Sequence, residues 1–106
     1  MLTRWKLIRD DEHCIVKDMP LDGLTVSHTT LKPKQATRGH SHPHAEVYLF
    51  KDYAELYLDK ERREVYPAEF VFISKNAYHR VFNIGNSEVE FYAFFQGNRS
   101  EAKYPK

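Results

Sequence analysis

Four side chains of types that bind transition metals stand in two short segments of the sequence. His40, His42 and Glu46 share one heptapeptide, and His79 follows much later in the chain. Three neutral imidazoles and one carboxylate suit iron, manganese, nickel, copper or zinc, and four protein ligands leave two positions open on an octahedral metal. Alternate residues of a strand share a face, which predicts a metal site on a strand, joined by His79 through tertiary folding. A solvated histidine-rich loop is the alternative.

Three further residues could take part in chemistry at such a site. His44 has the same parity as His42 and could contact the metal, lie behind its ligands or be exposed. His28 is expected to face inward, where it could act as a base, bind a substrate or be a hydrogen-bonded core histidine. Tyr48 shares the face of Glu46 and could donate a hydrogen bond to a substrate or simply pack. His28 and Tyr48 are the candidate catalytic residues.

The composition describes one small domain with enough apolar material for a core. The chain has 106 residues, a net charge of +1, 42% hydrophobic residues and 14% aromatic residues. Scattered charges give no basic face of the kind that nucleic acid requires. The single cysteine, Cys14, excludes an internal disulfide, and no N-terminal apolar run resembles a signal peptide or a membrane span. We therefore expect a cytoplasmic protein without a nucleic-acid or membrane partner.

Short strands separated by turns are predicted along the whole chain. Residues 1–14 read as a partly exposed edge strand that could pair with another subunit, and residues 19–23 as a turn. Residues 59–63 read as a charged turn. The predicted strands cover residues 24–31, 47–50, 53–58, 70–73, 79–82 and 89–96. The predicted aromatic core consists of Phe50, Phe70, Phe72, Phe91 and Phe95.

This pattern predicts an all-β fold, either an antiparallel sandwich or a barrel, whose inward residues line one cavity. We divide the chain into an N-terminal strand and turn at residues 1–23, which a second subunit could exchange, a barrel at residues 24–97 and a polar tail at residues 98–106. His28, His40, His42, Glu46, Tyr48 and His79 are the residues expected in that interior.

The metal-binding residues resemble the two motifs of the cupin superfamily. His40, His42 and Glu46 are in register with the first motif, G-x5-H-x-H-x3-4-E-x6-G, and His79 and Asn83 with the second, G-x5-P-x-G-x2-H-x3-N. The resemblance covers roughly residues 24–95 and fills all four family metal-ligand positions. It implies a single-domain cupin jelly-roll β-barrel, often a dimer, with a metal held by these four ligands inside one end.

The departures from the family pattern concern turns rather than ligands. Lys34, Tyr53, Ala68 and Asn76 stand where the pattern has glycine, and Ser74 stands where it has proline. We therefore expect turns of different shape, although Asn76 can adopt the left-handed conformation that glycine often supplies.

Two classes of function follow from the resemblance. The first is an enzyme in which one divalent transition metal (iron, manganese, zinc or nickel) binds two oxygens of a sugar, sugar phosphate or organic acid, for isomerisation or dioxygen chemistry. Residues 79–85 resemble the second motif of archaeal cupin-type glucose-6-phosphate isomerases, and small cupin dioxygenases fit the same ligand set. The second class is a non-catalytic module that binds a small molecule. In either case the expected partners are a small molecule and a second copy in a homodimer.

Overall fold

The computed structural model describes residues 4–97, and all the regular elements within them are β-strands. The strands are β1 (Lys6–Asp10), β2 (Cys14–Leu21), β3 (Leu24–Leu31), β4 (Glu46–Phe50), β5 (Ala54–Leu58), β6 (Glu61–Val65), β7 (Phe70–Ile73), β8 (His79–Phe82) and β9 (Val89–Gln96). Among these residues there is no helix with the length and hydropathy needed to cross a membrane.

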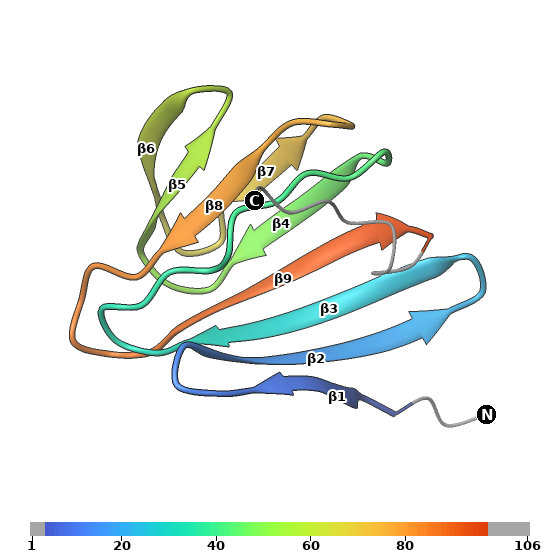
Figure 1. Cartoon of the computed structure of the whole chain (residues 1–106), viewed down its shortest axis with the longest axis horizontal. Coiled ribbons are helices and arrows are strands. Elements are labelled where there is room, and N and C mark those ends of the chain that lie inside the picture. Colours follow the sequence, from blue (N-terminus) through green and yellow to red (C-terminus); the bar gives the residue numbers. More distant parts are fainter. Residues whose placement is uncertain (1–3, 98–106) are drawn as a thin grey trace.

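The strands form two antiparallel sheets (Figure 1). Six strands are ordered β1-β2-β3-β9-β4-β7, and three are ordered β6-β5-β8. Strand β9 pairs with β3 on one side and β4 on the other, so it joins segments that are far apart in the sequence. The predicted all-β fold is confirmed.

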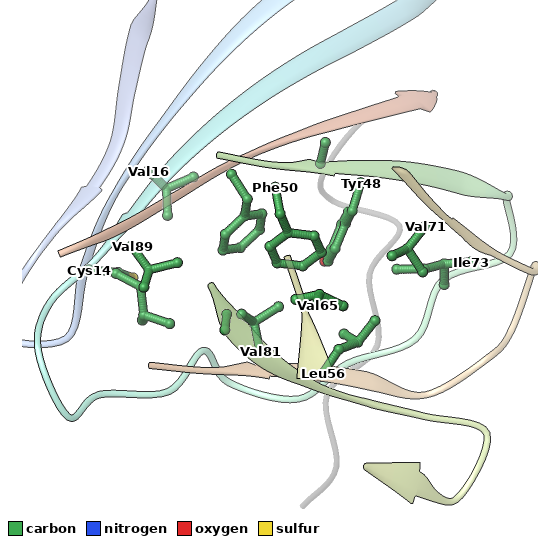
Figure 2. Packing of buried hydrophobic residues seen from close by; sticks show 14 of the residues in the cluster. Cys14, Val16, Tyr48, Phe50, Leu56, Val65, Val71, Ile73, Val81 and Val89 are labelled. Atoms are coloured by element: carbon green, nitrogen blue, oxygen red, sulfur yellow. The ribbon is translucent and has the colours of Figure 1, made fainter. Parts of the chain in front are cut away.

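The core lies between the sheets and follows the alternation of the strands. Strand β9 alternates buried and half-buried residues along nearly its whole length, as expected when one face of a pleated strand packs inward. Phe50, Phe91 and Phe95 are buried as predicted. They belong to a cluster, most of which is drawn in Figure 2, that comprises Cys14, Val16, Leu31, Tyr48, Phe50, Ala54, Leu56, Val65, Val71, Ile73, Val81, Val89, Phe91, Ala93 and Phe95.

Strand β7 places its aromatic residues on the opposite side from the one predicted. Phe70 and Phe72 are 67% and 63% exposed, whereas Val71 and Ile73 are buried. Figure 2 shows Val71 and Ile73 within the core cluster. Because successive side chains of a strand point to opposite faces, burying this pair turns both phenylalanines outward. Their assignment to the core was wrong.

Strand β2 was missed because its end contains turn-forming residues. Only Asp22 and Gly23 lie between the paired residues Leu21 and Leu24, and Gly23 has a φ of +72°. A two-residue hairpin of this kind favours positive φ. Pro20 has no N–H to donate to a neighbouring strand. It is tolerated in β2 because the pairing of β1 with β2 ends at Asp18, so Pro20 lies beyond the part of β2 that β1 pairs with.

Strand β6 was missed because almost all of its side chains are charged. Leu58 pairs with Glu61, and the two residues between them, Asp59 and Lys60, have φ values of +54° and +67°. Two consecutive positive φ values are the mark of a type I′ hairpin turn. The predicted turn at residues 59–63 is therefore shorter than expected, and the charges that follow belong to an edge strand, where they oppose pairing with other chains.

Three of the four positions where the cupin pattern has glycine keep a left-handed backbone. Lys34, Ala68 and Asn76 have φ values of +63°, +68° and +65°, whereas Tyr53 is not among the residues with positive φ. The side chains at these three positions therefore depart from the pattern, while their backbone has the conformation that glycine adopts most readily.

Candidate metal centre

The four predicted ligands come from three separate backbone segments. Glu46 is the first residue of β4, and His79 is the first residue of β8. His40 lies before β4 and forms an isolated bridge with His79, in which each N–H donates to the carbonyl of the other at 3.1 and 3.0 Å. The prediction of one strand carrying the heptapeptide was wrong, because the chain bends at residues 43–44.

The ligand atoms of these residues nevertheless converge. One atom from each of His40, His42, Glu46 and His79 lies within 4.8 Å of all the others. His42 Nε2 is 2.9 Å from Glu46 Oε1, and His79 Nε2 is 3.2 Å from the same oxygen. Three of the four residues are buried, and His40 is half-buried. The cluster therefore lies at the wall of the interior with one side accessible.

Backbone carbonyls set the orientation of all three imidazole rings. His42 Nδ1 donates to the carbonyl of His44 at 2.7 Å, and His79 Nδ1 donates to that of Ala77 at 2.9 Å. His40 Nδ1 is 3.3 Å from the carbonyl of Arg38. A carbonyl can only accept, so each Nδ1 carries the proton and each Nε2 is left as the ligand atom.

The electrostatics of the cluster favour a cation at its centre. Burial and the neighbouring His79 lower the pKa of His40 to about 4, so its ring is neutral at pH 7. Burial raises the pKa of Glu46, but the neighbouring imidazoles of His42 and His79 outweigh burial and lower that pKa to about 2. Burial opposes the change at His42, yet the Glu46 carboxylate raises its pKa. An ionised carboxylate thus faces imidazole nitrogens in a buried place.

One buried nitrogen lacks the partner that a metal ion would supply. His79 Nε2 is buried and has no hydrogen-bond partner, although it lies 3.2 Å from Glu46 Oε1. A buried polar atom without a partner is costly. Three Nε2 atoms and one carboxylate oxygen also match the ligand types of iron, manganese, nickel and zinc sites. The residues therefore fit one divalent transition metal.

His44 lies beside this cluster rather than in it. Its ring stacks on His42 at 4.2 Å between centroids and on Phe95 at 5.2 Å, and it is not one of the four converging groups. Its carbonyl accepts the hydrogen bond from His42 described above. Of the three roles left open for His44, the structure favours the one behind the ligands.

His28 faces away from the cluster, so the prediction of an inward His28 was wrong. Its Nε2 lies 2.8 Å from Glu90 Oε1, and its ring packs against Tyr92 and Trp5. Inward positions of β3 belong instead to the buried residues of the opposite parity, including Ser27. The geometry gives His28 no access to the interior.

Tyr48 lies on the interior side, as predicted. It is 4% exposed, and its ring centroid is 5.6 Å from that of His79. It lines a cavity of about 70 Å³ beside the ligands, which is bordered by Arg9, Cys14, Val16, Ser27, Thr29, Thr37, Arg38, His40, Glu46, Tyr48, Phe91 and Ala93. A hydrogen-bonding role for Tyr48 remains a prediction.

Sequence reasoning missed the polar wall of this cavity. Ser27 and Thr29 point inward from β3, and Arg9 and Arg38 lie at the rim. The alternation of Thr25, Ser27 and Thr29 along β3 was the available signal, because three hydroxyl residues of one parity indicate a shared polar face.

Solved structures resemble this fold closely although their sequences do not. AerE from Microcystis aeruginosa has a TM-score of 0.83 at 12% identity, over 96% of this chain and 52% of that one. A cupin-2 domain protein from Rhodospirillum rubrum has a TM-score of 0.82 at 12% sequence identity. The match covers 98% of this chain and 76% of that protein. An oxalate decarboxylase from B. subtilis has a TM-score of 0.82 at 14% sequence identity. The match covers 97% of this chain and 30% of the decarboxylase. The chain thus spans about half of AerE and less of the decarboxylase.

No protein-family model and no curated protein matches the sequence. The structural likeness, with nine strands in two facing sheets and the ligands of both motifs brought together, is sufficient to assign the fold. The protein has the fold of the cupin superfamily.

Proposed function

We propose that the protein is a metal-dependent enzyme that acts on a small oxygen-rich substrate by isomerisation or dioxygen chemistry. The observation that carries this proposal is the convergence of three imidazole nitrogens and one carboxylate beside a cavity. His40, His42, Glu46 and His79 would hold one divalent metal. Such an ion supplies Lewis acidity to substrate oxygens, or a site for dioxygen.

Elemental analysis of protein purified without a chelator or a histidine tag tests the metal site. We expect close to one transition metal per chain, lost in His79→Ala and retained in the matched variant His28→Ala, whose histidine lies on the outer face. Iron would direct assays toward dioxygen consumption, and zinc or manganese toward isomerisation. Absence of metal in every sample would reject the enzyme proposal.

Among the substrate classes, the cavity favours an organic acid. Its volume of about 70 Å³ accommodates only a few non-hydrogen atoms, which is less than a sugar phosphate occupies. Arg38 lies at its rim with Arg9, whose Nε is paired with Asp11, and guanidinium groups recognise carboxylates through paired hydrogen bonds. A small carboxylate with a second oxygen donor could therefore reach both the rim and the metal ligands. The structural likeness to an oxalate decarboxylase is compatible with this class.

Binding of small probes to the metal-loaded protein tests the substrate class. We expect oxalate and glycolate to bind more tightly than the uncharged glycolamide. Arg38→Gln should weaken carboxylate binding by about 10–100-fold, since a charge-assisted hydrogen bond contributes roughly 1.5–3 kcal/mol. Arg62→Gln is the matched control, because Arg62 packs over Phe82 on the other sheet. Equal affinity for charged and uncharged probes would reject the organic acid but leave the metal site intact.

A non-catalytic binding module is the second candidate, and one observation favours it. The outward position of His28 removes one of the two predicted catalytic residues from the interior and leaves Tyr48. Turnover of a bound carboxylate by metal-loaded protein, lowered in Tyr48→Phe without loss of metal, would support the enzyme. Binding without turnover would support the module.

A further inference from the structure

A groove lies on the outer face of the three-stranded sheet (Figure 1), away from the metal ligands. It has a volume of about 350 Å³ and is lined by Tyr57, Tyr78, Arg80 and Phe82, and we call it the outer groove. Successive side chains of a strand point to opposite faces, so the inward His79 places its two neighbours, Tyr78 and Arg80, outside. The outer groove is therefore separate from the cavity of the metal centre.

Aromatic rings form most of the outer groove. Tyr57 and Tyr78 meet edge to face, with their ring centroids 5.8 Å apart. The Tyr78 ring packs against the backbone of Gly39, where an added Cβ would lie 1.8 Å from its hydroxyl oxygen, so the ring is held in place. With Phe82, these rings give the groove a preformed surface on which a flat ligand can stack.

Arg80 gives the groove a positive charge that the described part of the chain does not neutralise. Its Nε donates to the carbonyl of Thr37 at 2.8 Å, and its guanidinium carbon lies 5.1 Å from the ring centroid of Phe82. No carboxylate of the described residues forms an ion pair with Arg80. The other cation over Phe82 is Arg62, at 3.9 Å, and its Nε is paired with Glu55 Oε1 at 2.5 Å. Arg80 is thus the charge that remains for a ligand.

The geometry of Arg80 suits a carboxylate beside an aromatic ring. Because Thr37 occupies only the Nε donor, the N–H groups of both terminal nitrogens remain available, and paired N–H groups of this kind match the two oxygens of a carboxylate. Tyr57 is the cross-strand partner of Arg80, so their Cβ atoms lie about 4.5–5.5 Å apart. A ligand the size of benzoate spans the distance between the ring and the guanidinium.

The size and charge of the groove argue against larger or simpler anions. Its volume lies at the lower end of the range of about 300–1,000 Å³ that is usual for small-molecule sites. Single-stranded nucleic acid needs several cations along its backbone as well as stacking rings, and the groove offers one unpaired arginine. An inorganic anion would use the arginine and leave the aromatic surface uncovered.

We propose that the outer groove binds a monocyclic aromatic carboxylate. The ring of the ligand stacks on Tyr57 and Tyr78, and its carboxylate accepts hydrogen bonds from Arg80. The proposal does not rest on the proposed function, because none of the four lining residues belongs to the metal-binding group or borders the interior cavity.

A titration followed by NMR, with benzoate as the probe, tests the site. Benzoate should bind at least about tenfold more tightly than benzamide, which lacks the charge, than cyclohexanecarboxylate, which lacks the aromatic face, and than inorganic phosphate. Arg80→Gln should weaken benzoate binding by at least about tenfold, since it removes a charge-assisted pair of hydrogen bonds. Tyr57→Val should weaken it by about 3–10-fold through loss of the stacking surface.

Arg63→Gln is the matched control. Tyr57 pairs with Arg62, so the next residue, Arg63, projects from the other face of β6, where it pairs with Glu69 at 2.8 Å. This variant should bind benzoate as the wild type does. His42→Ala should also bind benzoate unchanged, because the outer groove does not use the metal centre. Circular dichroism shows whether each variant is folded.

Intermolecular nuclear Overhauser effects locate the ligand, and we expect them between the ring protons of benzoate and those of Tyr57 and Tyr78. Equal affinity for benzoate and benzamide, or unchanged binding in a folded Arg80→Gln, would overturn the proposal. Phosphate that binds as tightly as benzoate would show a simple anion site instead. Loss of benzoate binding in His42→Ala would assign the ligand to the metal centre and not to the groove.

Discussion

At the scale of single residues, backbone carbonyls rather than other side chains prepare the histidines for a metal. His42 and His79 each donate Nδ1–H to a carbonyl two residues away, and His40 Nδ1 lies close to another. These carbonyls determine that Nδ1 is the protonated nitrogen of each ring, a role that a carboxylate side chain has in many other metal sites. The ligand atoms are therefore oriented by the local path of the chain, and side-chain substitutions around them should be better tolerated than changes of backbone shape.

Gly39 offers a direct test of this dependence on backbone shape. A Cβ added at this residue would lie 1.8 Å from Tyr78 Oη, and Tyr78 and Gly39 immediately precede the bridged residues His79 and His40. We expect Gly39→Ala to displace the Tyr78 ring and cost about 1–3 kcal/mol of unfolding free energy, as overpacking does. Urea denaturation measures this cost. The double variant Gly39→Ala/Tyr78→Ser should recover most of it, and failure to recover would place the strain outside this contact.

Asp11 controls the pH dependence of the turn between β1 and β2. The Arg9 guanidinium, and then the N–H groups of Cys14 and His13, hold the pKa of Asp11 well below its ordinary 3.8. A carboxylate with a lowered folded-state pKa stabilises the fold fully above its unfolded-state value, and this stabilisation is lost as the pH falls toward the folded value. The urea midpoint of Asp11→Ala should therefore differ most from wild type near neutral pH, and the difference should shrink below about pH 4. A constant difference would contradict this.

At the scale of elements, three turns carry a left-handed residue where glycine would be less strained. Ala68 has a φ of +68°, a conformation that costs a residue with a Cβ about 1–2 kcal/mol. Ala68→Gly should remove that cost against an entropic penalty of about 0.5–1 kcal/mol, and so raise the melting temperature by several degrees. Asn76→Gly is the control with a smaller expected gain, because asparagine tolerates this conformation. A lower melting temperature for Ala68→Gly would show that the turn is not strained.

The ligand set could be predicted from the sequence because its chemistry requires specific residue types. His40, His42, Glu46 and His79 are recognisable as candidate metal ligands by type and by their resemblance to the two cupin motifs, and the structure brings them together. The order of the strands and the distance between the two motifs in space depend on pairings between distant segments, which no local pattern contains.

The errors about which face is inward share one physical cause. On β3 the inner face carries Ser27 and Thr29, because it lines a polar cavity, whereas Val26 and His28 point outward. On β7 the more bulky Phe72 is likewise outside. The rule that apolar residues face inward fails when the interior holds a polar site and the exterior also carries apolar side chains. Strand β6 was missed for a related reason, since a charged edge strand has no apolar alternation to detect.

At the scale of the whole molecule, the proposed metal would join the two sheets. Glu46 belongs to the six-stranded sheet and His79 to the three-stranded one. A ligand that binds only the folded state stabilises it by about 2.7 kcal/mol at 100 times its dissociation constant. Adding the metal to metal-free protein should therefore raise the melting temperature by about 10 °C or more.

His42→Ala should abolish this metal-dependent shift while changing the melting temperature of the metal-free protein much less. The reason is that the core of Phe50, Leu56 and Ile73 packs without the site. Differential scanning calorimetry with and without metal measures both quantities, and His28→Ala should retain the full shift. If metal-free wild type and His42→Ala both fail to fold, the site serves mainly as a structural support.

The central position of β9 has a consequence for how the protein folds during synthesis. This strand lies between β3 and β4, yet it is the last strand of the described chain to leave the ribosome. Until residues 89–96 emerge, the two halves of the large sheet each expose an unpaired edge and cannot join. The nascent chain must therefore remain incompletely folded until residues 89–96 have emerged, and until then it is exposed to aggregation and to chaperones.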